Sequence, residues 1–232
     1  MYHIPKKEKW EFDESVTLIF EDMLSRSIPQ YEVMRKAVTD ICHHFLTPEG
    51  HLIDIGCSKG EQIKRCLRKN KTASYHGIEI SESMISHCLS SFEESKNLYF
   101  YQSDLRKDWP SIPDSDVIVS VLTLQFIPVE YRLSLLSKIY KNLKPGGVFV
   151  LVEKVIGNSV DLDDLMTTSY YNLKHDNGYS IYEIERKRLS LEGVLVPLTL
   201  KMNEQMLQSA GFTETDTFWR WFNFTGLISI KR

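Results

Sequence analysis

Apolar runs alternate with segments of helical spacing along most of the chain. The pattern predicts strands at residues 51–55, 75–80, 99–102, 116–122 and 148–153. The last two runs are apolar almost throughout, which is typical of strands buried on both faces of a sheet. Strands that alternate with helices in this way favour a parallel sheet covered by helices on both sides.

The two ends of the chain add to this central pattern. Residues 1–50 show helical spacing with a break near Pro29, and we expect them to form a helical lid. Residues 156–207 are predicted to be a mostly helical insertion that shapes a substrate pocket, and 218–232 to be a hairpin. The prediction is one α/β domain over 1–232, with a mostly parallel seven-stranded sheet and an antiparallel C-terminal strand.

Composition narrows the class of protein. The net charge is −3, and without a long basic tract the sequence gives no support for nucleic-acid binding. We expect no membrane segment, because no apolar run reaches the length that spans a bilayer, and the first residues lack the apolar core of a signal peptide. No CxxC spacing occurs, so we expect no metal site and reduced thiols in the cytoplasm. The cysteines are Cys42, Cys57, Cys66 and Cys88.

Three acids follow predicted strands in a regular series. Asp54 ends the first strand, and Gly56 and Gly60 flank the turn after it. Glu79 ends the second strand about twenty residues later, which is the offset of a ribose-binding carboxylate in a nucleotide-binding βαβ unit. Asp104 follows the third strand. Because the carboxyl ends of parallel strands meet at one edge of the sheet, the acids are predicted to line one crevice.

This series resembles the motifs of class I S-adenosylmethionine-dependent methyltransferases. The motif LKPGG at residues 143–147 adds to the likeness, and the GxGxxG spacing of NAD-binding proteins is absent. The resemblance implies a Rossmann-like class I methyltransferase fold with S-adenosylmethionine as cofactor. The implied cofactor-binding residues are Tyr31, Asp54, Gly56, Cys57, Ser58, Gly60, Glu79, Ile80, Met84, Asp104 and Leu105. One of these residues, Met84, has packing in the hydrophobic core as an alternative to cofactor contact.

Nearly the whole chain is similar to bacterial carboxy-S-adenosylmethionine synthases. The similar segments are 10–31, DIGCSKG, TLQFI, LKPGGVFVLVEK, NGYS and WFNFTGLISIK. The resemblance implies a homodimer that uses prephenate to make a carboxylated sulfonium metabolite for tRNA wobble-uridine modification. It also implies that Tyr31 contacts the bound cofactor.

Two departures from that family alter the predicted reaction. Val121 stands where the family has an Asn, and Met206 stands where counting from the AGF turn places the Arg that binds the cofactor's carboxylate. We therefore expect methyl transfer from plain S-adenosylmethionine to O or N of a small-molecule acceptor. The alternatives are a true synthase, with a cation such as Lys201 in place of the Arg, and a non-catalytic cofactor-binding module.

Methyl transfer requires alignment of donor and acceptor more than a strong base. The candidate catalytic residues are His175, Gln125 and Tyr171, from the insertion and from the end of the fourth strand. His175 is the natural base near neutral pH, and the alternative is that it is an ordinary histidine on the surface. The alternative to a catalytic role for Gln125 is a structural one.

Overall fold

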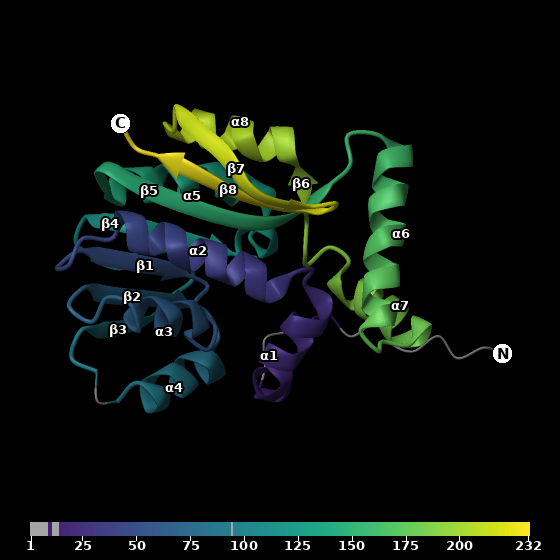
Figure 1. The fold of residues 1–232 in the computed structure, drawn as a ribbon, viewed down its shortest axis with the longest axis horizontal. Coiled ribbons are helices and arrows are strands. Elements are labelled where there is room, and N and C mark those ends of the chain that lie inside the picture. The colour runs from purple at the N-terminus through teal and green to yellow at the C-terminus, as the bar shows by residue number, and fades with distance from the viewer. Residues whose placement is uncertain (1–8, 11–13, 94) are drawn as a thin grey trace.

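The computed structural model describes residues 9–10, 14–93 and 95–232 (Figure 1). Seven strands hydrogen-bond in the order β3-β2-β1-β4-β5-β8-β7, and the short strand β6 pairs with β5. The strands are β1 (His51–Ile55), β2 (Ser74–Glu79), β3 (Leu98–Gln102), β4 (Ser115–Val121), β5 (Leu143–Ile156), β6 (Leu198–Thr199), β7 (Glu214–Trp221) and β8 (Phe224–Ile230).

Helices cover both faces of this sheet. They are α1 (Glu14–Ser27), α2 (Tyr31–Phe45), α3 (Glu61–Leu67), α4 (Glu82–Ser91), the 3-10 turn η1 (Leu124–Phe126), α5 (Val129–Asn142), α6 (Val160–Asp176), α7 (Ile181–Leu191) and α8 (Leu200–Ala210). The predicted break near Pro29 separates α1 from α2. Ser81 caps α4 by accepting a hydrogen bond from the Met84 backbone N–H.

The sheet has the predicted direction of strands. Neighbours from β3 through β5 are parallel, and β8 is antiparallel to both β5 and β7. The register places Asp54 opposite Gly77 and Val119, and Glu79 opposite Gln102. The predicted Rossmann-like fold, with a mostly parallel sheet and an antiparallel C-terminal strand, is confirmed.

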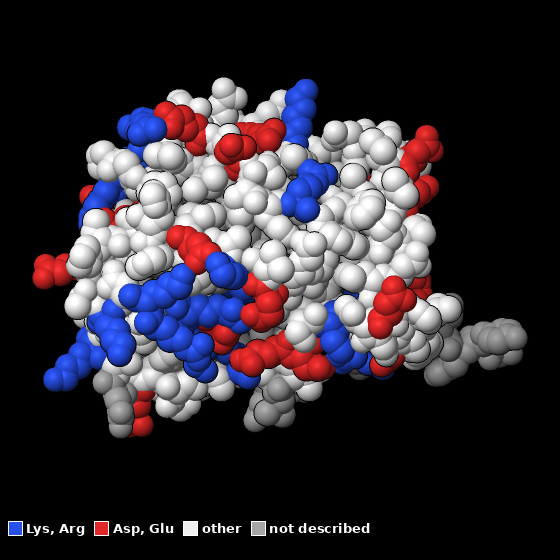
Figure 2. All heavy atoms as spheres, in the orientation of Figure 1, with Lys and Arg blue, Asp and Glu red and all other residues white. Residues whose placement is uncertain are grey.

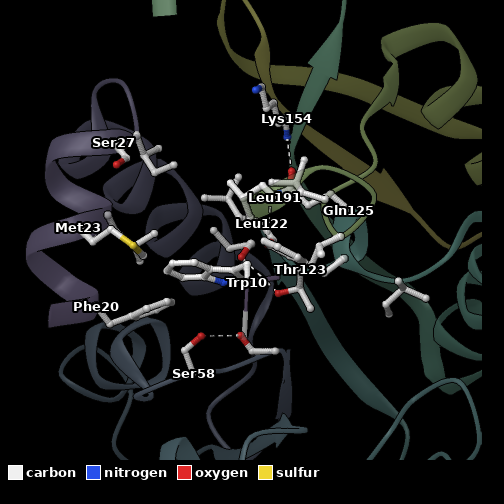
Figure 3. A pocket seen from close by; sticks show the side chains of 18 of the residues that line it. Trp10, Phe20, Met23, Ser27, Ser58, Leu122, Thr123, Gln125, Lys154 and Leu191 are labelled. Carbon is white, nitrogen blue, oxygen red and sulfur yellow. Dashed lines mark hydrogen bonds between the residues drawn. The ribbon is translucent and has the colours of Figure 1, made fainter. Parts of the chain in front are cut away.

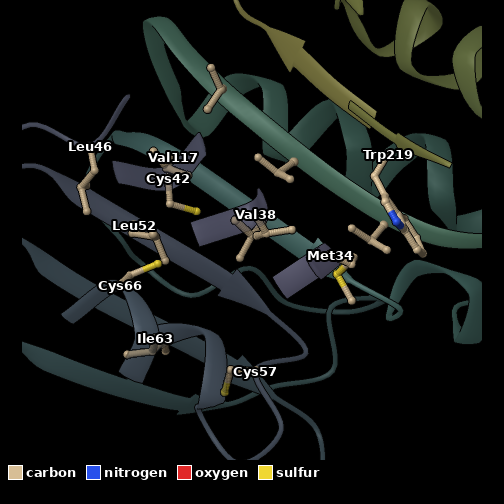
Figure 4. Close-up of a cluster of buried hydrophobic side chains, with 14 of the residues drawn as sticks. Met34, Val38, Cys42, Leu46, Leu52, Cys57, Ile63, Cys66, Val117 and Trp219 are labelled. Atoms are coloured by element: carbon tan, nitrogen blue, oxygen red, sulfur yellow. The ribbon is translucent and has the colours of Figure 1, made fainter. Parts of the chain in front are cut away.

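Two apolar clusters hold the layers together. One lies under α2, α3 and α4 and contains Val38, Cys42, Leu52 and Val117, all buried (Figure 4). The other lies on the opposite face and joins α5 and α8 to the strands. Burial of aliphatic side chains on both faces explains why β1 and β4 are almost continuously apolar.

The outer surface of α2 and α3 is charged rather than apolar. Figure 2 shows Lys and Arg side chains gathered there, with acids among them. Arg65 binds Glu32 and Glu61 at 2.9 and 2.8 Å, and Lys69 binds Asp40 at 2.6 Å. These ion pairs neutralise much of the local charge. In the described part of the chain, no helix is long and apolar enough to cross a membrane.

Several boundaries differ from those that the sequence predicts, and strand β7 of the hairpin begins at Glu214 rather than at residue 218. Strand β5 begins at Leu143 because Ser115 pairs with it and Gly146 donates to the Lys231 carbonyl at 2.7 Å. The predicted insertion 156–207 contains the two-residue strand β6. Helix α8, which overlaps its end, packs beside α5. Of the described residues of the insertion, those that line the cavity come from α6, α7 and the loop before β6.

Candidate active site

A cavity of about 970 Å³ opens at the carboxyl ends of the strands. Its walls come from the ends of β1, β2, β4 and β5, the loop after β3, and α1, α6 and α7. Trp10 and Ser27 show that the described part of the predicted lid lines it, whereas residues 1–8 and 11–13 of that lid lie outside the described residues. The volume is at the upper end of the roughly 300–1,000 Å³ range of small-molecule sites.

The turn after β1 depends on left-handed backbone conformations. Gly56 and Gly60 have φ of 68° and 76°, and Ser58 has φ of 49°. A Cβ on Gly56 would lie 2.3 Å from the Thr123 side chain, so this position requires glycine. The backbone N–H groups of Gly56 and Cys57 both donate to the Ile78 carbonyl, which ties the turn to β2.

Glu79 is held at the end of β2 by three backbone donors. Its Oε1 accepts from Ile80 and Ser81 at 2.8 and 3.0 Å, and its Oε2 accepts from Ser58 at 3.0 Å. A carboxylate has about four lone-pair sites, so this one retains acceptor capacity toward the cavity that it lines. Such a fixed acceptor fits the hydroxyl groups of a ribose.

Asp54 lies deeper, below the turn, in the cavity wall. Its carboxyl group is buried, and this burial raises its pKa to about 7, although the Arg35 guanidinium lowers it. Arg35 also lines the cavity, and its Nε donates to the Tyr31 hydroxyl at 3.2 Å. A basic group and an acid therefore stand together at this end, which fits the carboxylate and ammonium of an amino acid.

The loop after β3 supplies a different kind of acid. Asp104 accepts from the Arg106 Nε at 2.8 Å and Nη2 at 2.7 Å, and these bonds lower the pKa of Asp104. An adenine amino group would therefore share this carboxylate with Arg106. Leu105 is buried beside it in the cavity wall and offers the apolar surface that an adenine ring requires.

The structure brings most of the predicted cofactor residues together. Lining the cavity are Asp54, Gly56, Cys57, Ser58, Glu79, Ile80, Asp104 and Leu105.

Three predicted cofactor residues lie behind the cavity wall. Tyr31 is buried outside the cavity wall, where its hydroxyl accepts from Arg35, and the direct cofactor contact that the resemblance implies stays a prediction. Gly60 closes the turn through its N–H to the Cys57 carbonyl at 2.8 Å. Met84 packs in a small apolar cluster with Phe20, as its alternative reading expected.

The predicted catalytic residues separate in the structure. Gln125 and Tyr171 line the cavity. The Gln125 side chain is anchored to backbone, because its Oε1 accepts from the Lys154 N–H at 2.8 Å. His175 lies outside the cavity wall with 65% of its side chain exposed, which is the surface position of its alternative reading, and its role as a base stays a prediction. A helix rotates by roughly 100° per residue, which turns His175 away from its buried neighbour Lys174.

Lys154 lies at the opposite end of the cavity from Ser58, and further basic side chains line the cavity. Figure 3 shows Lys154 at that end, and Lys174, Lys187 and Arg188 line the same cavity. Burial lowers the pKa of Lys174 to about 8 and that of Lys187 to about 7.

Three further residues of the cavity wall, Arg35, Lys174 and Lys187, are not among those predicted from the sequence. The spacing of Tyr170 and Lys174, four residues apart on one helix, was the available signal.

Met206, which the sequence places at the carboxylate site, is elsewhere. It lies on α8 and packs against the cluster that contains Leu136 and Phe149. It is not part of the cavity wall, whereas Val121 is. The residue at position 206 therefore says nothing about the charge of the site. Among the described residues, no group of three or more His, Cys, Asp or Glu side chains is arranged to hold a metal ion.

Known proteins resemble this chain at two levels. Residues 53–149 match a methyltransferase domain family. A carboxy-S-adenosyl-L-methionine synthase of Campylobacter fetus subsp. fetus is 36% identical over 228 residues, covering 98% of this chain and 97% of that protein. The corresponding synthase of Wolinella succinogenes is 39% identical and covers 97% of this chain and 95% of its own length.

Solved structures agree with the fold. The Haemonchus contortus phosphoethanolamine N-methyltransferase 2 complex with S-adenosyl-L-methionine has a TM-score of 0.68 at 14% identity, over 95% of this chain and 57% of that one. The CurJ carbon methyltransferase has a TM-score of 0.65 at 18% identity, over 94% of this chain and 61% of that one. With full-length relatives above 30% identity, the chain belongs to the carboxy-S-adenosyl-L-methionine synthase family, and it is an enzyme of the S-adenosylmethionine-dependent methyltransferase fold.

Proposed function

We propose that this protein makes carboxy-S-adenosyl-L-methionine from S-adenosylmethionine and a small carboxylic acid, for which prephenate is the donor that the family resemblance implies. One observation carries the proposal beyond the family relationship. The cavity joins the acid-bearing strand ends to a set of basic side chains, among them the half-buried Lys154 and the buried Lys174. A neutral methyl acceptor gives those cations no partner, whereas a carboxylate does.

The residues at the strand ends fit S-adenosylmethionine. Glu79 presents a fixed carboxylate for the ribose, and Gly56 allows the chain to approach a ligand closely. Arg35 and Asp54 suit the amino acid portion, and Leu105 suits the adenine ring. When bound, the sulfonium activates its methyl group for reaction.

The reaction exchanges one proton of that methyl group for a carboxyl group. With prephenate as donor, the ring loses the carboxyl group and a hydroxide and becomes aromatic. The hydroxide and the released proton form water, so atoms and charge balance. The chain's contribution is to align the two substrates and exclude water, for which the apolar walls from α1 and α7 are suited.

The expectation of methyl transfer to O or N rested on two departures, Val121 and Met206. Position 206 gives no information about this site, because Met206 packs in the apolar cluster under α8 and the cations come from β5, α6 and α7. The departure at Val121 remains, since this apolar side chain lines the cavity where the family has an amide.

The direct test is incubation of the purified protein with S-adenosylmethionine and prephenate carrying a ¹³C-labelled ring carboxyl group. Mass spectrometry is expected to find the label in a sulfonium product heavier by one carboxyl group. The control replaces S-adenosylmethionine with S-adenosylhomocysteine, which lacks the methyl carbon that receives the carboxyl group. Recovery of only S-adenosylhomocysteine together with a methylated acceptor would reject the proposal.

Assembly and location remain predictions. Exposed apolar side chains on the outer faces of α6 and α7 support a homodimer, and they include Val160, Leu165, Ile181 and Tyr182. Light scattering of the purified protein measures the assembly. The four unpaired cysteines accord with the predicted cytoplasmic location.

A further inference from the structure

Two lysine side chains flank one tyrosine ring in the cavity. Lys154 lies near the end of β5, and Tyr170 and Lys174 lie one turn apart on α6. Each Nζ is 4.9 Å from the centre of the Tyr170 ring. The two ammonium groups therefore share one aromatic neighbour, and all three residues line the cavity.

These two ammonium groups lack a carboxylate partner among the described residues. Their recorded side-chain contacts are to aromatic rings: both to Tyr170, and Lys174 also to Tyr179 at 5.8 Å. Burial lowers the pKa of Lys154, and the charge of Asp163 opposes this shift without a direct contact between the two side chains. The Oδ1 of Asp163 accepts a hydrogen bond from the Gly157 N–H at 2.7 Å. Lys174 is only 6% exposed. Because burying cations without anions is costly, the arrangement is suited to receiving a negative group from a ligand.

The position of the pair separates it from the cofactor's own amino acid. Lys154 and Ser58 lie at opposite ends of the cavity in Figure 3. Arg35 stands beside Asp54 at the strand end and supplies a cation there. The cofactor's carboxylate thus has a basic partner near the glycine turn, and the lysine pair is left for a second molecule.

We propose that Lys154 and Lys174, held against Tyr170, bind a carboxylate of the small-molecule donor. The inference rests on the proposed function and makes it specific, because it assigns the donor to the α6 side of the cavity. Two ammonium groups select an anionic donor over a neutral one of the same shape. They act by holding the donor in place, and no proton transfer is assigned to them.

The test compares K154Q, K174Q and K174R with the exposed control K201Q on α8. Calorimetry measures two affinities for each variant: S-adenosylmethionine alone, and prephenate in the presence of S-adenosylhomocysteine, which prevents turnover. We expect K154Q and K174Q each to weaken prephenate binding by about tenfold or more, with S-adenosylmethionine binding unchanged. K174R retains the charge and is expected to bind prephenate nearly as well as the wild type does, and K201Q is expected to change neither affinity.

Three results would overturn the inference. If K154Q and K174Q weaken the binding of S-adenosylmethionine as much as that of prephenate, the lysines bind the cofactor instead. They serve neither if both affinities stay unchanged, and a wild type that does not bind prephenate also contradicts the inference. Lysine-dependent prephenate binding without carboxylated product from the wild type would reject the proposed function and retain the carboxylate site, so the two failures are distinguishable.

Discussion

The Ser58 backbone N–H donates a 3.0 Å hydrogen bond to the Oε2 of Glu79. This contact joins the turn after β1 to the acid at the end of β2, across 21 positions of the chain. Ser58 also has a positive φ of 49°, so the turn at this position has a left-handed conformation. The shape of the turn and the orientation of the carboxylate therefore depend on each other, and a change in either is expected to affect cofactor binding.

Replacing Glu79 with Gln is expected to weaken S-adenosylmethionine binding by roughly 10- to 100-fold. The amide loses the charge, and its NH2 group either faces the Ser58 N–H or displaces the bonds from Ile80 and Ser81. Hydrogen bonds to charged groups contribute about 1.5–3 kcal/mol each, which corresponds to that range. Calorimetric titration of the variant measures the loss.

The matched control is Glu204→Gln, on the exposed face of α8, which is expected to leave the affinity unchanged. If Glu79→Gln bound S-adenosylmethionine as the wild type does, Glu79 would be an ordinary strand-end acid and the proposed ribose contact would be wrong.

Replacing Gly56 with Ala is expected to abolish measurable cofactor binding and to lower the melting temperature. The new Cβ would lie 2.3 Å from Thr123, so the end of β4 must move. Gly146→Ala is the control, because its φ of 79° is also positive but nothing lies within 4 Å of a Cβ there. That variant isolates backbone strain, which costs about 1 kcal/mol. Equal effects of the two variants on binding would show that packing against Thr123 is unimportant.

The cofactor-binding end of the cavity was predictable because its acidic residues lie at the ends of consecutive strands. Asp54, Glu79 and Asp104 each come just after a recognisable apolar run, and parallel strands bring their carboxyl ends to one edge. Local sequence thus specified both the elements and the convergence of the acids.

The basic end was not predictable in the same way. Lys154, Lys174 and Lys187 lie on β5, α6 and α7, and only the packing of α6 and α7 over the sheet brings them to one cavity. Distance along the chain carries no information about such an arrangement. Counting from the AGF turn led to Met206, whose helix faces the apolar cluster instead.

The contribution of Glu153 to the stability of the protein is expected to fall as pH rises from about 4.5 to about 8. Burial raises the pKa of this carboxyl from 4.5 to about 8. In that range the folded chain keeps the proton and the unfolded chain loses it. The contribution of Glu153 to the free energy of unfolding therefore decreases by about 1.4 kcal/mol per pH unit. Asp54, whose pKa rises to about 7, contributes with the same sign.

Glu153→Gln isolates the contribution of this group, since Gln has nearly the same shape and does not titrate. Urea unfolding at pH 5 and pH 8 is expected to show a smaller loss of stability for the variant than for the wild type. Parallel profiles for the two proteins would mean that Glu153 has an ordinary pKa in the folded state.

Prephenate binding is expected to weaken above pH 8, provided that Lys174 holds its carboxylate. Burial, and to a lesser extent Lys154, lower the pKa of the Lys174 ammonium group to about 8, so the free site loses this charge above that pH. The other titratable groups facing it are Tyr170, Tyr179 and Lys187. Well above pH 8, the dissociation constant for prephenate is expected to rise by about tenfold per pH unit.

The Lys174→Arg variant separates this lysine from its neighbours. A guanidinium stays protonated throughout the range, so prephenate binding by the variant is expected to be nearly constant between pH 8 and pH 9.5, while wild-type binding weakens. Lys187, whose pKa is near 7, would instead weaken binding from that lower pH in both proteins. A wild-type profile that begins to rise near pH 7 and is shared by the variant would assign the effect to Lys187 and reject it for Lys174.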